Sequence, residues 1–153
     1  MKQEFVKLGK SFRAAWHGLC TVVRRERNFR IHLVVSAYVL AFAWLGRVSG
    51  AQLALLFACI GLVLALELVN TAVETLCDRV TTKQDEQIGK VKDFAAAAVL
   101  IAALMAAAAG LAIFLSKPVL LAVWGALCAA PHWGFLLILA LLPAFLFIFR
   151  FKK

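Results

Sequence analysis

Residues 51–78 read AQLALLFACIGLVLALELVNTAVETLCD, a long apolar run whose last third carries charge. A helix crosses the roughly 30 Å hydrocarbon core of a bilayer with about 20 residues, so this one reaches the far edge near Asn70. Glu67 then lies at the inner edge of the hydrocarbon, and Glu74 and Asp78 extend into water. A charge at mid-membrane costs about 2.5–3.5 kcal/mol, so these carboxylates indicate chemistry or ion handling rather than scaffolding.

The rest of the chain is also strongly apolar. Its 153 residues are 64% hydrophobic, well above the roughly 45–50% of soluble domains. We therefore expect an all-α integral membrane protein. The apolar segments are 31–49, 51–77, 94–115 and 119–149, and we divide the chain into an N-terminal interfacial helix (1–30), a three-helix membrane core (31–116) and a C-terminal extension (117–153).

Residues 4–24 have the pattern of an amphipathic helix on the membrane surface. Phe5, Phe12 and Trp16 recur at helical spacing, and basic residues such as Lys10 occupy the other side. Such a helix lies in the interface with its apolar face toward lipid. The alternative is a helix that packs against the spans of the same chain.

Basic residues predict the topology. Eight of the 17 lie in residues 1–30, four in 78–93 and three in 150–153. Because such residues stay on the cytoplasmic side, both termini and the 78–93 loop are expected inside a bacterial plasma membrane, which requires an even number of spans. We expect a short amphipathic or re-entrant piece over 119–130 and a fourth span over 132–149. The basic excess needs no nucleic acid, because topology and anionic lipids account for it.

Polar residues in the second run share one helical face. Glu67, Asn70, Glu74 and Asp78 are spaced by three, four and four positions, which aligns them on a helix. This stripe must face other helices, a subunit interface or water. Two further polar stretches, Glu26 with Arg30 and Lys92 with Asp93, precede the first and third runs and meet it at the inner face.

Phosphoryl transfer would use these residue types well. Carboxylates are the usual protein ligands of Mg²⁺, and lysine offsets the charge of ATP phosphates. A carboxylate also accepts the proton of an attacking hydroxyl. Glu67 is placed to reach a hydroxyl presented by a lipid, and Glu74 to reach a metal-bound nucleotide.

Other interpretations stay open from the residues alone. The intramembrane carboxylates also suit a proton or cation relay in a small transporter. The histidines and cysteines show no metal-ligand spacing. The structural alternatives are an interhelical hydrogen bond for Asn70, a topological anchor for Lys92, a surface ion pair for Glu26, and a helix-end or salt-bridge role for Asp78.

The same residues form a recognisable combination of motifs that spans about residues 5–115. In this combination the chain resembles the prokaryotic diacylglycerol kinase and undecaprenol kinase family of small membrane kinases. The motifs are Glu67-x-x-Asn70-Thr71-Ala72-Val73-Glu74-x-x-x-Asp78, Lys92-Asp93-x-Ala95-Ala96-x-Ala98-Val99 and Glu26-Arg27-Asn28-Phe29-Arg30-Ile31-His32.

The resemblance implies an ATP- and Mg²⁺-dependent lipid kinase, organised as a homotrimer of three-span subunits with active sites between them. It makes Glu67 the general base and gives Glu26 and Glu74 to the metal. It further implies nucleotide contacts from Asn70, Glu74, Lys92, Asp93, Glu26 and Lys7, and lipid contacts from Glu67, Ala96 and Arg30.

Details of the motifs favour undecaprenol as the substrate, with diacylglycerol as the second candidate. Ala96 stands where diacylglycerol-using members tend to have serine, and residues 26–32 look like the undecaprenol type. Two departures are notable. Gln84-Asp85 replaces a Tyr-His pair near the nucleotide, and the segment from residue 117 has no counterpart in the three-span kinases.

Overall fold

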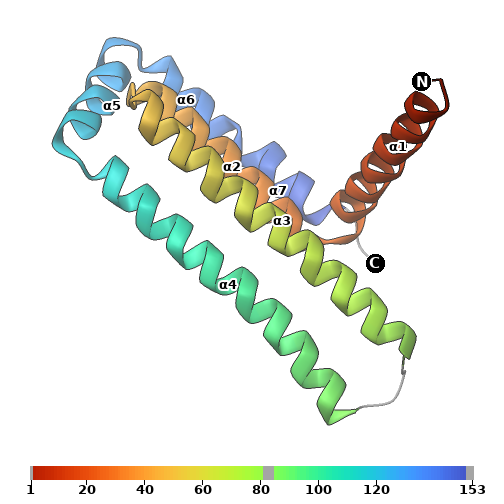
Figure 1. Ribbon diagram of the computed structural model, residues 1–153. Helices are drawn as coiled ribbons and strands as arrows, with labels where there is room; N and C mark the ends of the chain where they lie inside the picture. The colour runs from red at the N-terminus through yellow and green to blue at the C-terminus, as the bar shows by residue number, and fades with distance from the viewer. Residues whose placement is uncertain (1, 81–84, 151–153) are drawn as a thin grey trace.

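The computed structural model describes residues 2–80 and 85–150, and these residues form helices joined by short turns, without a strand among them (Figure 1). α3 packs against both α2 and α4, and α7 packs against α2. The helices are α1 (Lys2–Arg25), α2 (Arg27–Leu45), α3 (Gly50–Val80), α4 (Glu86–Phe114), α5 (Lys117–Ala129), α6 (His132–Leu139) and α7 (Leu141–Phe149).

Four helical segments within the described residues are long and apolar enough to cross a membrane: α2, α3, α4 and the α6–α7 pair. The all-α membrane fold with a fourth C-terminal span is therefore confirmed. α3 and α4 are longer than the apolar runs that predicted them. α4 begins at Glu86, eight residues before the apolar run at 94, because the Asp85 carboxylate accepts hydrogen bonds from the backbone N–H groups of Gln87 and Ile88. Such an N-cap satisfies donors that the helix itself leaves unpaired.

α1 is a continuous helix, as its periodicity predicted, and it projects away from the other helices (Figure 1). Phe5, Phe12 and Trp16 are each about 70% exposed, and the first buried side chain in the described part of α1 is Val22 near its end. Most of α1 is therefore not packed against this chain's own spans. Its position on the membrane surface stays a prediction.

The C-terminal extension turns across the far end of the bundle through α5 and returns along α2 (Figure 1). The returning span is divided at Ala140 into α6 and α7. Pro143 explains the break, since proline disrupts a helix interior but fits the first turn, where Pro143 lies in α7. The Tyr38 hydroxyl of α2 donates a hydrogen bond of 3.1 Å to the Leu137 carbonyl, and the Trp44 and Trp133 rings meet edge to face with centroids 5.1 Å apart.

α5 packs closely against the end of α2 at Gly46. A Cβ atom there would lie 2.7 Å from Cγ1 of Val119 and 3.3 Å from Cγ2 of Val123. We expect Gly46→Ala to destabilise the protein by about 1–3 kcal/mol through overpacking. Thermal unfolding in detergent measures this, with Gly125→Ala in α5 as the control because its Cβ meets nothing within 4 Å. An unchanged melting temperature for Gly46→Ala would contradict this packing.

Candidate functional site

The acidic stripe predicted on α3 is present and largely turned inward. Glu67 and Asn70 are buried, and Glu74 is half-buried. The Asn70 side-chain amide donates a hydrogen bond of 2.9 Å to Oε1 of Glu74. The Asn70 Oδ1 atom is buried and has no hydrogen-bond partner among the described residues. A buried acceptor without a donor is costly, so this oxygen is available to a bound water or ligand.

Glu26 joins the stripe from the turn between α1 and α2. Glu26 and Glu74 lie close enough to Glu67 for their negative charges to repel its carboxylate. Glu26 has extended backbone dihedrals (φ −98°, ψ 116°), and its side chain does not cap α2. Within the described residues no ion pair engages Glu26, which contrasts with the surface ion pair considered from the sequence. Glu26 and Glu74, from two separate parts of the chain, are therefore within electrostatic range of Glu67.

Lys92 brings α4 to the same end of the bundle. Its Nζ atom lies 2.5 Å from Oδ1 of Asp78, which connects α4 to α3 across 14 residues of sequence. Lys92 also interacts electrostatically with Glu74. The salt-bridge role considered for Asp78 is confirmed, and Lys92 is more than a topological anchor. Asp93 is adjacent in sequence and exposed, and Ala96 is exposed one turn further along α4.

A cleft of about 1230 Å³ opens between α1 and α3, with Glu26, Thr71 and Asp78 in its lining. Glu67, Asn70, Glu74 and Lys92 are not among the residues that line it. The lining also contains cationic residues that sequence reasoning had used only for topology. The positive charge of these residues could have indicated a role at the site. Helical spacing within one segment, however, does not show which residues of α1 lie next to α3. A cleft with carboxylates and cations suits a polyphosphate with its metal. The added cationic lining residues are Arg24, Arg25 and Arg79, together with His17.

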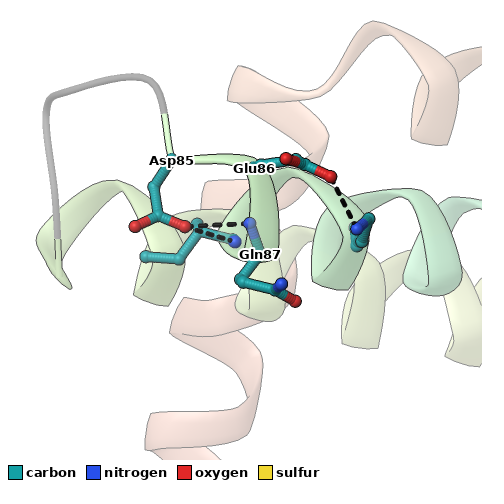
Figure 2. A network of polar contacts seen from close by, with 5 residues as sticks. Asp85, Glu86 and Gln87 are labelled. Carbon is teal, nitrogen blue, oxygen red and sulfur yellow. Dashed lines mark hydrogen bonds and ion pairs between the residues drawn. The ribbon is translucent and has the colours of Figure 1, made fainter.

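The start of α4 is organised by its own local contacts. Figure 2 shows the Asp85 carboxylate receiving the backbone hydrogen bonds of Gln87 and Ile88. Glu86 pairs with Lys90 one turn later, at 2.7 Å. Asp85 thus serves as the N-cap of α4. Gln84 lies outside the described residues.

Lys7 and Arg30 are the two remaining predicted site residues. Lys7 is exposed on α1, ten residues before the first lining residue of the cleft, about 15 Å along the helix. Arg30 is 1% exposed, and its guanidinium donates hydrogen bonds to backbone carbonyls of α1 and α7. The suggested roles of Lys7 and Arg30 at the substrates stay predictions.

Comparisons with known proteins show which family the sequence matches. A sequence model described as prokaryotic diacylglycerol kinase matches residues 13–114. The chain is 36% identical to the undecaprenol kinase of Bacillus subtilis over 116 residues, which cover 76% of this chain and 94% of that protein. It is 39% identical to a diacylglycerol kinase of Synechocystis over 101 residues, 65% of this chain and 58% of that protein. It is 35% identical to the diacylglycerol kinase of Escherichia coli over 104 residues, 67% of this chain and 84% of that protein.

The family match covers α2, α3 and α4 completely and ends at Phe114, the last residue of α4. It therefore contains the three carboxylates and Lys92, whereas α5, α6 and α7 lie beyond it. With the match spanning most of the sequence and the acidic site lying inside it, the chain belongs to the prokaryotic diacylglycerol kinase family and is a membrane lipid kinase that uses ATP.

Proposed function

We propose that this kinase phosphorylates the hydroxyl of undecaprenol at the cytoplasmic face of the bacterial plasma membrane. The observation that carries this proposal is the acidic face of α3, where Asn70 binds Glu74 beside the buried Glu67, together with Glu26, which lines an open cleft at the same end of the apolar spans. A lipid alcohol in the bilayer and a nucleotide in water can meet only at the membrane surface, where the apolar spans end. Membership of a kinase family sets aside the transporter considered from the sequence.

Glu67 serves as the general base in this proposal. It accepts the proton of the lipid hydroxyl while the hydroxyl oxygen attacks the γ-phosphorus of ATP. A bond forms between that oxygen and the phosphorus, and the bond to the bridging oxygen of ADP breaks. Burial of Glu67 keeps water away from its carboxylate, which favours the lipid alcohol over water as the acceptor.

Glu26 and Glu74 would hold Mg²⁺, which would offset the charge of the ATP phosphates when bound. Within the described residues no three acidic, histidine or cysteine side chains form a metal site of their own. Mg²⁺ is commonly bound through one or two carboxylates together with substrate phosphates and water. The unpartnered Asn70 oxygen beside Glu74 supports a ligand at the same place. Lys92 and Asp93 contribute at the nucleotide from the start of α4.

An apolar cavity supports a lipid chain next to Glu67. It has a volume of about 440 Å³, lies between α2, α3 and α4, and includes Val63 in its lining. Val63 is one helical turn before Glu67, so a hydrocarbon chain in this cavity would leave its head group near the carboxylate. Ala96 follows Lys92 by one turn of α4 and fits a contact to the lipid.

The protein is proposed to act as a homotrimer. Large apolar residues on α3 and α4 remain exposed in the single chain, among them Phe57, Leu62, Leu104 and Met105. Such faces suit lipid or another subunit. Lys7, distant from the carboxylates within one chain, would contribute to the site of an adjacent subunit.

A direct substrate comparison tests the proposed function. Purified protein in mixed micelles receives labelled ATP, Mg²⁺ and either undecaprenol or diacylglycerol at equal mole fraction. We expect kcat/KM to be at least about tenfold higher for undecaprenol, equal to about 1.4 kcal/mol of discrimination. The undecaprenol kinase of Bacillus subtilis, which matches over 94% of its length, supports this choice. A preference for diacylglycerol would instead support the second candidate, which the relatives from Synechocystis and Escherichia coli favour.

A further inference from the structure

Arg30 is the most buried charged side chain among the described residues, with 1% of its surface exposed. Its Nη1 atom donates hydrogen bonds to the carbonyls of Val23, at 3.0 Å, and Arg24, at 3.1 Å. Its Nε atom donates a hydrogen bond of 3.0 Å to the carbonyl of Ile148. One guanidinium thus connects three segments of the chain, which are the end of α1, the first turn of α2 and the end of α7.

The carbonyls that Arg30 binds lie at the C-terminal ends of helices. The last four carbonyls of a helix have no partner inside that helix, and the C-terminal end carries a partial negative charge. Val23 and Arg24 are in the last turn of α1, and Ile148 is in the last turn of α7. The buried cation therefore neutralises two helix ends, and those ends compensate the cost of burying the cation.

A second contact joins the same elements. The guanidinium carbon of Arg27, the first residue of α2, lies 6.0 Å from the centre of the Phe149 ring, over its face. Such a cation–π contact is attractive. The end of α7 is therefore held at the turn between α1 and α2 by both an arginine bridge and an aromatic contact.

Glu26 is the residue inside that turn. It lies between the last residue of α1 and the first residue of α2, and the Arg30 N–H donates a 3.4 Å hydrogen bond to its carbonyl. Its side chain does not cap α2, so the direction of the carboxylate depends on how the two helices meet. Arg30 determines the angle between α1 and α2, because it belongs to α2 and its side chain is hydrogen-bonded to the end of α1. The third partner, Ile148, belongs to the extension that the family match leaves out.

We propose that Arg30 is a positioning residue through which the C-terminal span, α6 and α7, holds Glu26 in place at the kinase site. The proposal rests on the proposed magnesium role of Glu26. It makes the extension a working part of this enzyme and gives Arg30 a task other than direct lipid contact.

The test measures Mn²⁺ binding by electron paramagnetic resonance in the presence of a non-hydrolysable ATP analogue, using the full-length protein in detergent. Arg30→Gln removes the bridge, and Arg30→Lys keeps the charge without the forked geometry. Phe149→Pro acts from the other side, because a residue before proline is disfavoured in the helical region, which turns the Ile148 carbonyl away. Phe149→Ala is its matched control, since it removes the ring but leaves the backbone. Tyr38→Phe removes another hydrogen bond to the same span, distant from Glu26.

We expect Arg30→Gln and Phe149→Pro each to weaken Mn²⁺ binding by about tenfold or more, as for other supports of metal ligands. Arg30→Lys should recover part of the loss, and Tyr38→Phe should stay within about twofold of the unchanged protein. Phe149→Ala loses the aromatic contact but keeps the arginine bridge, so it should weaken binding clearly less than Phe149→Pro. Because Arg30→Gln already removes the Ile148 contact that Phe149→Pro disturbs, the double variant should bind about as weakly as Arg30→Gln alone. In turnover, KM for the metal–nucleotide should rise while KM for the lipid is maintained.

Failure of this inference can be distinguished from failure of the proposed function. If Glu26→Gln weakens Mn²⁺ binding but Phe149→Pro behaves like Phe149→Ala, the C-terminal span does not position Glu26 and the inference is wrong. If Glu26→Gln itself leaves Mn²⁺ binding unchanged, the magnesium role in the proposed function is wrong, and the inference falls with it. Should Arg30→Gln fail to fold, Arg30→Lys and Phe149→Pro give the same decision.

Discussion

Glu67→Gln is expected to reduce kcat by about 10²–10⁴-fold, the usual contribution of a positioned general base. Glutamine has nearly the same shape but cannot accept the hydroxyl proton. Glu67 is buried, and its carbonyl accepts a 3.0 Å hydrogen bond from the Thr71 hydroxyl, which the substitution preserves. Phosphate transfer to the lipid is measured with labelled ATP, and nucleotide binding is measured separately.

Nucleotide binding should survive this change. Removing one of three mutually repelling carboxylates relieves repulsion at the site, so affinity for the nucleotide should be maintained or slightly increased. Glu86→Gln is the control, because Glu86 is exposed and pairs only with Lys90 among the described residues. A Glu67→Gln enzyme that retained more than about a tenth of the activity would rule out Glu67 as the base.

Glu74→Gln is expected to weaken binding of the metal–nucleotide by about 10–100-fold, as measured by the KM for Mg·ATP and by Mn²⁺ binding. The change removes a negative charge next to Lys92 and one of the two proposed metal ligands. The hydrogen bond from Asn70 can persist, because the glutamine oxygen still accepts it. The loss should therefore come from the charge rather than from the fold.

Raising the Mg²⁺ concentration distinguishes a metal-ligand role for Glu74 from a structural one. A weakened metal site should regain activity as Mg²⁺ is increased, whereas a misfolded site should not. The KM for the lipid should change by less than about twofold, and Glu86→Gln again serves as the control. An unchanged Mg²⁺ requirement in Glu74→Gln would exclude this residue from the metal site even though the family is established.

The spanning helices could be predicted because each is long, apolar and separated from the next by charge. The relation between Glu67, Asn70 and Glu74 could be predicted as well, since spacings of three and four residues decide which side chains share a helical face. The residues at which the helices begin and end were harder to predict from the sequence. The cap at Asp85 extends α4 into a polar region where hydrophobicity gives no signal.

The amino-acid sequence by itself determined that this is a membrane protein with its acidic residues on one face of α3, because hydropathy and helical periodicity are local properties of the chain. The kinase activity came from the resemblance of its motifs to a known family. Only the tertiary structure decided which side chains meet across helices. It paired Lys92 with Asp78, lined the cleft with Arg24, Arg25 and Arg79, and bound Arg30 to the end of α7. The physical reason is that these contacts depend on how distant segments of the chain pack together. For Arg30 the partners are backbone carbonyls, which every residue carries, so no residue type indicates them in advance.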